Sequence, residues 1–399
     1  MASYSSLIDL IDQVTSKVKG GISPEDEPYR RRLGQAALRL SQAMEEPHDT
    51  VHRLGNAPFQ TALAHVGIEK GIFKAIAKRE GNHVTNETLA QETNIHPSLM
   101  NRLLRYYQSM GMAAQHGPDR YGPTITTKNL TSPICDTGVS FYFRVLSPAF
   151  IAVPQLLSEI NYDNVVDPNH CAWHIGRNTD EAPWKYLQSR PELARVVSNW
   201  MAVQREGLPC FLDAMDFAET NSDTDESTPL LVDMGGGMGS QCIVFRQRCP
   251  HLPGRVILQE QQHVIDQVAS DPLPGFRELG VEAQVHDLFE KQPVQGARAY
   301  YMRNVLHDFT DDACVQILQN IQPSMSEDSV ILVDEMVLSD YGVPSRAAQM
   351  DMAMLTCLAA KERSEEEWKE LFDRAGFKII NMYRYSPEFQ DAVQVIVPK

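Results

Sequence analysis

The chain has 399 residues, 43% of them hydrophobic and 22% charged, a composition typical of a soluble globular protein with two or three domains. Its formal net charge of −16 argues against broad binding to the phosphate backbone of a nucleic acid. The N-terminus has no basic segment followed by an apolar one, and the sequence has no run of about eighteen apolar residues. We therefore expect neither a secretory signal nor a membrane span.

The seven cysteines are scattered, without a Cys-x-x-Cys pair or a cluster of histidine and cysteine. An odd, unpatterned set is typical of buried thiols in a reducing compartment, and not of a disulfide framework or a zinc site. We expect a cytoplasmic protein without a bound metal.

The first quarter of the chain has a helical pattern. Residues 4–18 place five apolar side chains on one stripe, which must be buried against another surface, such as a second chain. After a polar break at 20–28, further helices are expected at 30–45 and 58–79. The stripe consists of Leu7, Ile8, Ile11, Val14 and Val18.

Residues 85–123 predict two helices followed by a hairpin, the order of a winged helix. Thr85 and His96 are suited to cap the two helices, and Pro97 fits the first turn of the second. The second helix could read DNA, or it could serve packing and dimerisation. It carries only two cations and several apolar residues, so we favour packing. The two cations are Arg102 and Arg105, and the residues that favour burial are Leu99, Leu103, Leu104 and Tyr106.

The middle of the chain has mixed helical signals, with one helix expected over 193–217. A polar linker at 219–228 marks a boundary before the next apolar stretch. We therefore divide the chain into three parts: a helical winged-helix domain at 1–125, a helical connector at 126–225 and an α/β domain at 226–399.

The α/β domain opens with a buried strand, a glycine turn and a helix. The strand covers 230–234, the helix 240–249, and the glycines between them have the spacing G-x-G-x-G. Glycine allows a sharp turn and lets a ligand approach the backbone. About twenty residues later, a second strand ends in Glu260, where such folds place an acid on ribose hydroxyls.

The acid within the first strand, Asp233, would repel a phosphate and suits a cationic or zwitterionic ligand. The pattern resembles motif I of the S-adenosylmethionine-dependent methyltransferases. NAD binding and a plain strand-turn-helix connection are the alternatives at this point.

Alternating strands and helices continue to the C-terminus. The last two strands have no helix between them, so the final strand should be an antiparallel hairpin partner. The order resembles the seven-stranded sheet of a class I methyltransferase. The expected strands are 255–259, 281–285, 297–302, 330–333, 377–385 and 392–397, with helices at 311–325 and 364–375.

Three groups follow successive strands at the edge where chemistry is expected. An imidazole at His307, flanked by the carboxylates of Glu335 and Glu362, is the arrangement of a general base, because a carboxylate fixes the tautomer and stabilises the imidazolium. Taken singly, each residue could equally serve a loop or a helix cap. Together they favour a site.

Four motifs resemble the caffeate/flavonoid-type O-methyltransferases, in their fungal branch, and the likeness covers nearly the whole chain. They are Asp233-Met-Gly-Gly-Gly-Met-Gly, Met302-Arg-Asn-Val-Leu-His-Asp-Phe, Val333-Asp-Glu-Met and Lys361-Glu-Arg-Ser-Glu-Glu-Glu-Trp.

This resemblance implies a role for each matching residue. His307 would be the base, Glu335 and Glu362 its flanking acids, and Asp308 an acid that orients the acceptor. Met201 and Gln204 would line the substrate pocket; plant relatives have histidine where Gln204 stands. S-adenosylmethionine would contact Asp233, Gly235, Gly237, Glu260, Asp287, Leu288 and Arg303.

The resemblance therefore implies an O-methyltransferase that acts on a hydroxyl of a small aromatic or polyketide-type metabolite. It also implies a homodimer through the N-terminal domain and an acceptor pocket lined by the connector. The alternative is a pericyclase or dehydratase of the same fold that does not consume S-adenosylmethionine. A winged-helix regulator without enzymatic activity is the third reading.

Overall fold

The computed structural model describes residues 4–19, 21, 26–79, 82–220 and 223–399. The polar break at 20–28 and the linker at 219–228 lie partly outside these residues. The chain divides into two compact units, Met1–Val139 and Ser140–Lys399, which we describe separately.

The first unit is mostly helical. Its helices are α1 (Tyr4–Lys19), α2 (Glu27–Ala43), α3 (Pro47–Gly55), α4 (Ala57–Glu69), α5 (Ile72–Ala77), α6 (Asn86–Thr93), α7 (Pro97–Ser109) and α8 (Ile125–Asn129), and its strands are β1 (Ala114–Gly117) and β2 (Arg120–Gly122).

The caps of α6 and α7 are as predicted. The side chains of Thr85 and His96 accept hydrogen bonds from the N–H groups of Thr88 and Ser98. The single helix predicted over 58–79 is wrong, because Gly71 adopts a positive φ of 70° and separates α4 from α5.

A long helical run crosses from the first unit into the second. It consists of α9 (Pro133–Phe141), a π-helical turn (Tyr142–Leu146) and α10 (Ser147–Glu159). By length and composition alone this run could cross a membrane, although the core helix of a soluble protein passes the same test. Its side chains from Phe141 to Leu156 contribute to a hydrophobic core with Trp173 and Leu193.

The helix predicted over 193–217 is also wrong. Helix α13 (Pro191–Val203) ends 14 residues before Phe217, and Gly207 follows it with a φ of 71°. Pro209 removes a further backbone donor, so the helix cannot continue. The remaining short elements of this region are α11 (Ala172–Arg177), α12 (Pro183–Gln188), η3 (Phe211–Asp213) and α14 (Phe217–Thr220).

The second unit is built on a mixed sheet with the strand order β5-β4-β3-β6-β7-β10-β9. The first five of these are parallel. Strand β10 is antiparallel to both β7 and β9, as expected because no helix was predicted between the last two strands. A two-residue strand, β8 (Arg363–Ser364), pairs with the end of β7. The other strands are β3 (Pro229–Met234), β4 (Arg255–Glu260), β5 (Val281–Val285), β6 (Ala299–Arg303), β7 (Val330–Leu338), β9 (Phe377–Ser386) and β10 (Asp391–Pro398).

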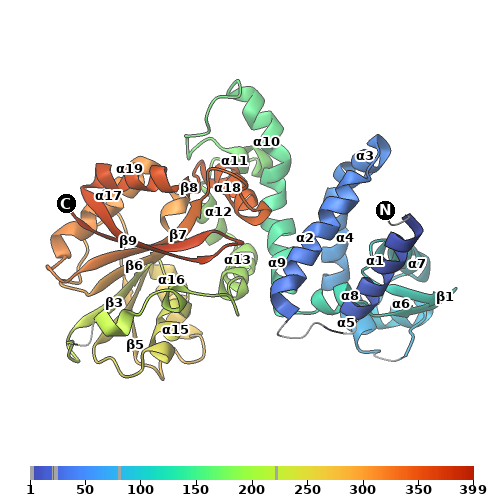
Figure 1. The fold of residues 1–399 in the computed structure, drawn as a ribbon, viewed down its shortest axis with the longest axis horizontal. Helices are drawn as coiled ribbons and strands as arrows, with labels where there is room; N and C mark the ends of the chain where they lie inside the picture. The colour runs from blue at the N-terminus through green and yellow to red at the C-terminus, as the bar shows by residue number, and fades with distance from the viewer. Residues whose placement is uncertain (1–3, 20, 22–25, 80–81, 221–222) are drawn as a thin grey trace. The chain divides into compact units, whose positions relative to one another are not determined.

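Helices cover both faces of this sheet (Figure 1). Helices α17 (Asp311–Ile321) and α19 (Glu365–Ala375) pack on one face through Ile317, Trp368 and Phe372. Helices α15 (Ser240–Arg248) and α16 (Gln262–Ser270) pack on the other through Phe245 and Val268.

Two differences from the predicted elements matter for the site. Strand β7 continues to Leu338, so Glu335 lies within the strand and not after it. Helix α18 (Ser345–Leu358), which the sequence pattern did not predict, brings a further acid, Asp351, to this edge of the sheet.

Candidate active site

The glycine turn after β3 requires backbone conformations that suit glycine. Gly235, Gly237 and Gly239 have φ values of 75°, 58° and 81°. Gly236 has a different reason, because a Cβ there would lie 2.4 Å from the carboxyl group of Asp233. The predicted acid therefore lies directly beneath the turn.

Asp233 is almost fully buried and accepts a hydrogen bond from the thiol of Cys242. Burial, together with the neighbouring Glu260, raises the pKa of this carboxyl to about 7 against the lowering effect of the thiol. A positively charged ligand near the turn would favour the ionised form.

Glu260 ties the end of β4 to the glycine turn. Its Oε1 accepts from the N–H of Gly237 at 3.1 Å and its Oε2 from the N–H of Gln261 at 2.8 Å. Each carboxylate oxygen has two lone pairs, so both can still accept a hydrogen bond from a hydroxyl group.

The other predicted cofactor residues lie on the neighbouring strand ends. Asp287, after β5, is exposed and accepts from the N–H of Phe289 at 3.0 Å. Leu288 packs against the core of the sheet. Arg303, at the end of β6, has its Nε 3.6 Å from Asp334 Oδ2.

Arg303 belongs to a buried polar group around Asp334. The hydroxyls of Tyr301 and Tyr385 donate to the two oxygens of Asp334 at 2.6 Å each. Burial lowers the pKa of the Arg303 guanidinium, but Asp334 and the tyrosines raise it by more. Arg303 is therefore a fixed positive charge at the strand edge.

The chain turns sharply after β6. Asn304 has φ 52°, which asparagine tolerates, and the next residues form a short 3₁₀ turn, η4 (Leu306–Asp308). Three N–H groups of this loop point to Glu335 Oε1, those of Val305 and Leu306 at 2.8 Å and that of His307 at 3.4 Å.

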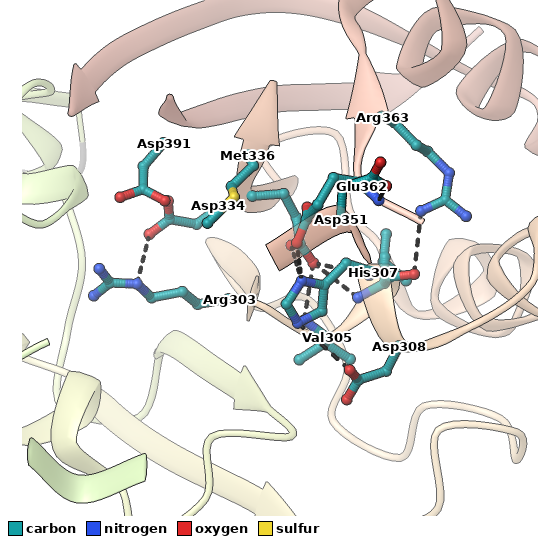
Figure 2. Close-up of polar contacts among 12 residues, drawn as sticks. Arg303, Val305, His307, Asp308, Asp334, Met336, Asp351, Glu362, Arg363 and Asp391 are labelled. Carbon is teal, nitrogen blue, oxygen red and sulfur yellow. Dashed lines mark hydrogen bonds and ion pairs between the residues drawn. The ribbon is translucent and has the colours of Figure 1, made fainter. Parts of the chain in front are cut away.

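Glu362 and Glu335 both lie beside His307, as predicted, and Figure 2 shows Glu362 next to the ring. Nδ1 of His307 is 2.7 Å from Glu362 Oε1 and 3.8 Å from Glu335 Oε2, so only Glu362 is hydrogen-bonded to the ring. All three residues are buried, and one nitrogen or oxygen from each lies within 4.8 Å of the others. Nε2 is left facing Asp308, whose Oδ1 is 3.5 Å away.

The pKa values of this cluster reflect burial and charge together. Burial lowers the pKa of His307, but Glu362, Glu335 and Asp308 raise it by more, to about 10. Burial raises the pKa of Asp308 to about 6 against the effect of His307, and raises that of Glu335 to about 7. The cluster therefore binds protons strongly near neutral pH.

Two residues that hold this cluster were missed by the sequence analysis. Asp351, on α18, accepts from the N–H of Glu362 at 3.0 Å. Arg363 is fully buried, and its guanidinium donates to the carbonyls of Leu306 and Phe309 and to Asp311. The sequence showed only that Arg363 follows a proposed acid, and this gives little indication of its role while its hydrogen-bond partners are unknown.

Met201 and Gln204 lie at the end of α13, and Gln204 Nε2 is 2.8 Å from Met201 Sδ. Met201 is 44% exposed. The two side chains contact each other, and their role toward a substrate stays a prediction.

Comparison with known proteins gives a family. A model of the O-methyltransferase domain matches residues 214–378. The O-methyltransferase ucdC of Aspergillus ustus is 32% identical over 92% of this chain and 94% of its own length. Among solved structures, LepI in complex with SAM has a TM-score of 0.89 at 29% identity, and a protein described as a pericyclic reaction enzyme has 0.88 at 30%. These cover 99–100% of this chain and 100% of the other chains. The sheet and its helices are those of a class I methyltransferase, and the chain belongs to the O-methyltransferase family.

Proposed function

We propose that this protein is an S-adenosylmethionine-dependent O-methyltransferase that acts on a hydroxyl of a small aromatic or polyketide-type metabolite. The observation that carries the proposal is the buried 2.7 Å contact between His307 Nδ1 and Glu362, which leaves Nε2 available as a proton acceptor. The similarity to LepI bound to SAM and to ucdC supports the cofactor and the reaction.

The residues around the glycine turn fit this cofactor. Asp233 offers a buried carboxyl group and Glu260 a partly buried one to a ligand with positive charge and ribose hydroxyls. Nothing lies within 4 Å of the position of a Cβ on Gly237, so the backbone is open there. When bound, S-adenosylmethionine supplies an electrophilic methyl group on a sulfonium sulfur. We further assign contacts to Gly235, Asp287, Leu288 and Arg303, as the resemblance implies.

The catalytic residues move one proton. Glu362 holds the Nδ1–H tautomer of His307, so Nε2 carries the lone pair that takes the acceptor's hydroxyl proton. Glu362 then stabilises the imidazolium. Asp308, beside Nε2, is placed to orient a donor group of the acceptor. Met201 and Gln204 are proposed to line the acceptor pocket.

The test of the function is to follow product and S-adenosylhomocysteine together by mass spectrometry, using an extract of native metabolites as the source of acceptor. Methyl transfer requires the two to form in equal amounts. The alternative is a pericyclase or dehydratase that does not consume the cofactor, which the similarity to a pericyclic reaction enzyme keeps open. Product without S-adenosylhomocysteine would establish that alternative instead.

Glu260→Ala should weaken the binding of S-adenosylmethionine by about 1–3 kcal/mol, because it removes a charged hydrogen-bond acceptor. Isothermal calorimetry on both proteins measures the change. Glu282→Ala is the matched control, since Glu282 lies on the next strand and pairs with Arg255. Equal affinity of the Glu260 variant and the unchanged protein would show that Glu260 does not hold the ribose.

We also propose a homodimer formed through the winged-helix domain at 1–125, in the cytoplasm. The stripe on α1 supports this, since Leu7, Ile8 and Ile11 are 43–57% exposed within one chain. The free cysteines of the structure support the proposed reducing compartment.

Replacing both Ile8 and Ile11 with Glu should convert the dimer to a monomer, because charge would be placed in an interface of about 2,000 Å² or more. Light scattering at micromolar concentration measures the mass. Gln13→Glu, on the opposite face of α1, should leave the dimer intact. A monomeric unchanged protein would contradict the proposal.

A further inference from the structure

The two glutamates beside His307 contact residues 305–307, here called the catalytic loop, in different ways. Glu362 Oε1 lies 2.7 Å from the imidazole, whereas the nearest Glu335 oxygen lies 3.8 Å away, beyond hydrogen-bonding distance. Glu335 Oε1 instead accepts from the three backbone N–H groups of 305–307. Glu362 therefore orients the ring, and Glu335 holds the loop that carries it.

The second oxygen of each glutamate has no hydrogen-bond partner among the described residues. Glu335 Oε2 and Glu362 Oε2 are both buried, and the two carboxyl groups approach within 4.8 Å. Two ionised carboxylates at this distance would leave two unpaired negative oxygens away from water, which is unfavourable. Carboxyl groups that share a site usually resolve this by sharing one proton.

We propose that Glu335 is a positioning residue that acts as a neutral carboxylic acid, with Oε1 holding the catalytic loop and Oε2 carrying a proton shared with Glu362. The inference rests on the proposed methyltransferase function only for its catalytic consequence. Burial, together with the neighbouring Glu362, raises the pKa of Glu335 to about 7 against the lowering effect of His307.

A neutral Glu335 changes what His307 can do. The cluster of His307, Glu335 and Glu362 then carries one negative charge before the reaction and none after the imidazole has taken the acceptor's proton. A second full negative charge would raise the pKa of His307 further, so that the imidazole would release its proton only at still higher pH. The titratable and charged groups around Glu335 are His307, Asp308, Asp351, Cys314, Glu362 and Arg363.

The protonation state is measured on the cofactor-free protein, so it does not depend on the proposed reaction. In protein labelled with [carboxyl-¹³C]glutamate, nuclear magnetic resonance should show one carboxyl group that titrates near pH 7. This signal should be absent from Glu335→Gln and present in Glu260→Gln, which removes the other glutamate whose pKa burial raises.

Kinetics give the second measurement. Glutamine at 335 keeps the oxygen that accepts from the loop and offers an N–H where the proton of Glu335 lies, so the acidic limb of the pH profile should not move. The matched variant Glu362→Gln removes the charged partner of the ring. It should lower kcat about a hundredfold and move that limb to lower pH by about one unit or more.

The proposal is overturned if every glutamate other than Glu260 titrates below about pH 5. It is also overturned if Glu335→Gln moves the acidic limb as far as Glu362→Gln does. If Glu335→Gln does not fold, the labelled unchanged protein and Glu260→Gln still decide the question. A lack of S-adenosylhomocysteine formation would refute the proposed function and leave the resonance result valid.

Discussion

His307→Ala should lower kcat about a hundredfold or more and leave the affinity for S-adenosylmethionine nearly unchanged. A positioned general base contributes roughly 10²–10⁴-fold to a rate, and the imidazole here is buried, oriented by Glu362 and adjacent to Asp308. Binding both reactants side by side in the reactive orientation lowers the barrier by about 7–11 kcal/mol in the best cases, and the substitution should not change this contribution. Steady-state kinetics and calorimetry separate the two contributions.

The pH dependence sharpens this prediction. A base must be unprotonated, and the carboxylates hold the pKa of His307 at about 10 in the free protein, although burial opposes them. The value of kcat/KM should therefore rise with pH and continue to rise above pH 8. The loss caused by His307→Ala should shrink at high pH and be least for acidic acceptors, because their hydroxyl ionises without help.

His251→Ala is the matched control, since His251 is exposed and lies on the loop after α15. It should leave kcat unchanged. If His307→Ala retained kcat within about threefold, His307 would not be the base.

Arg363→Met should lower the free energy of unfolding by about 3–5 kcal/mol. The guanidinium is fully buried, donates to the carbonyls of Leu306 and Phe309 and to Asp311, and lies 4.9 Å from the ring centre of Trp368. Methionine fills much of the volume but donates nothing, so two carbonyl groups and a carboxylate would each lose a charged donor. Urea unfolding followed by circular dichroism measures the change.

Arg374→Met is the control for this substitution. Arg374 pairs with Asp311 and Asp312 from a position that is half exposed, and exposed ion pairs contribute about 0–1 kcal/mol. Equal stability of the two variants would show that Arg363 does not anchor the loop. A fall in kcat for Arg363→Met alone is also expected, because the same loop carries His307.

Local sequence determined most elements of the sheet. The strand ending in Met234, the glycine turn and the strand ending in Glu260 are where the pattern predicted them. Ser364 caps α19, with its side chain accepting from the N–H of Glu367. These features depend on backbone conformation and on alternation of apolar residues, which are properties of short segments.

Predicted helix lengths failed where glycine interrupts a helical pattern. Both wrong helices end near a glycine with positive φ, Gly71 in one case and Gly207 in the other. The apolar periodicity continued past these positions. Whether glycine breaks a helix depends on packing that periodicity does not contain.

By itself, the sequence determined the fold class and predicted that an imidazole and two acids meet at one edge of the sheet, where the carboxyl ends of parallel strands lie. The structure brings these three side chains together. Only the tertiary structure decided which acid bonds to His307. Glu335 lies within strand β7, and its Oε1 accepts from the backbone N–H groups of 305–307. The carboxylate that is hydrogen-bonded to the His307 ring is therefore that of Glu362. Asp351 accepts from the N–H of Glu362, and the buried Arg363 is the next residue in the chain. These partners are 11–57 residues apart in the chain, and their distances are set by how β7, β8 and α18 pack. Local propensity carries no information about such contacts, so the division of roles within the site is a property of the folded chain.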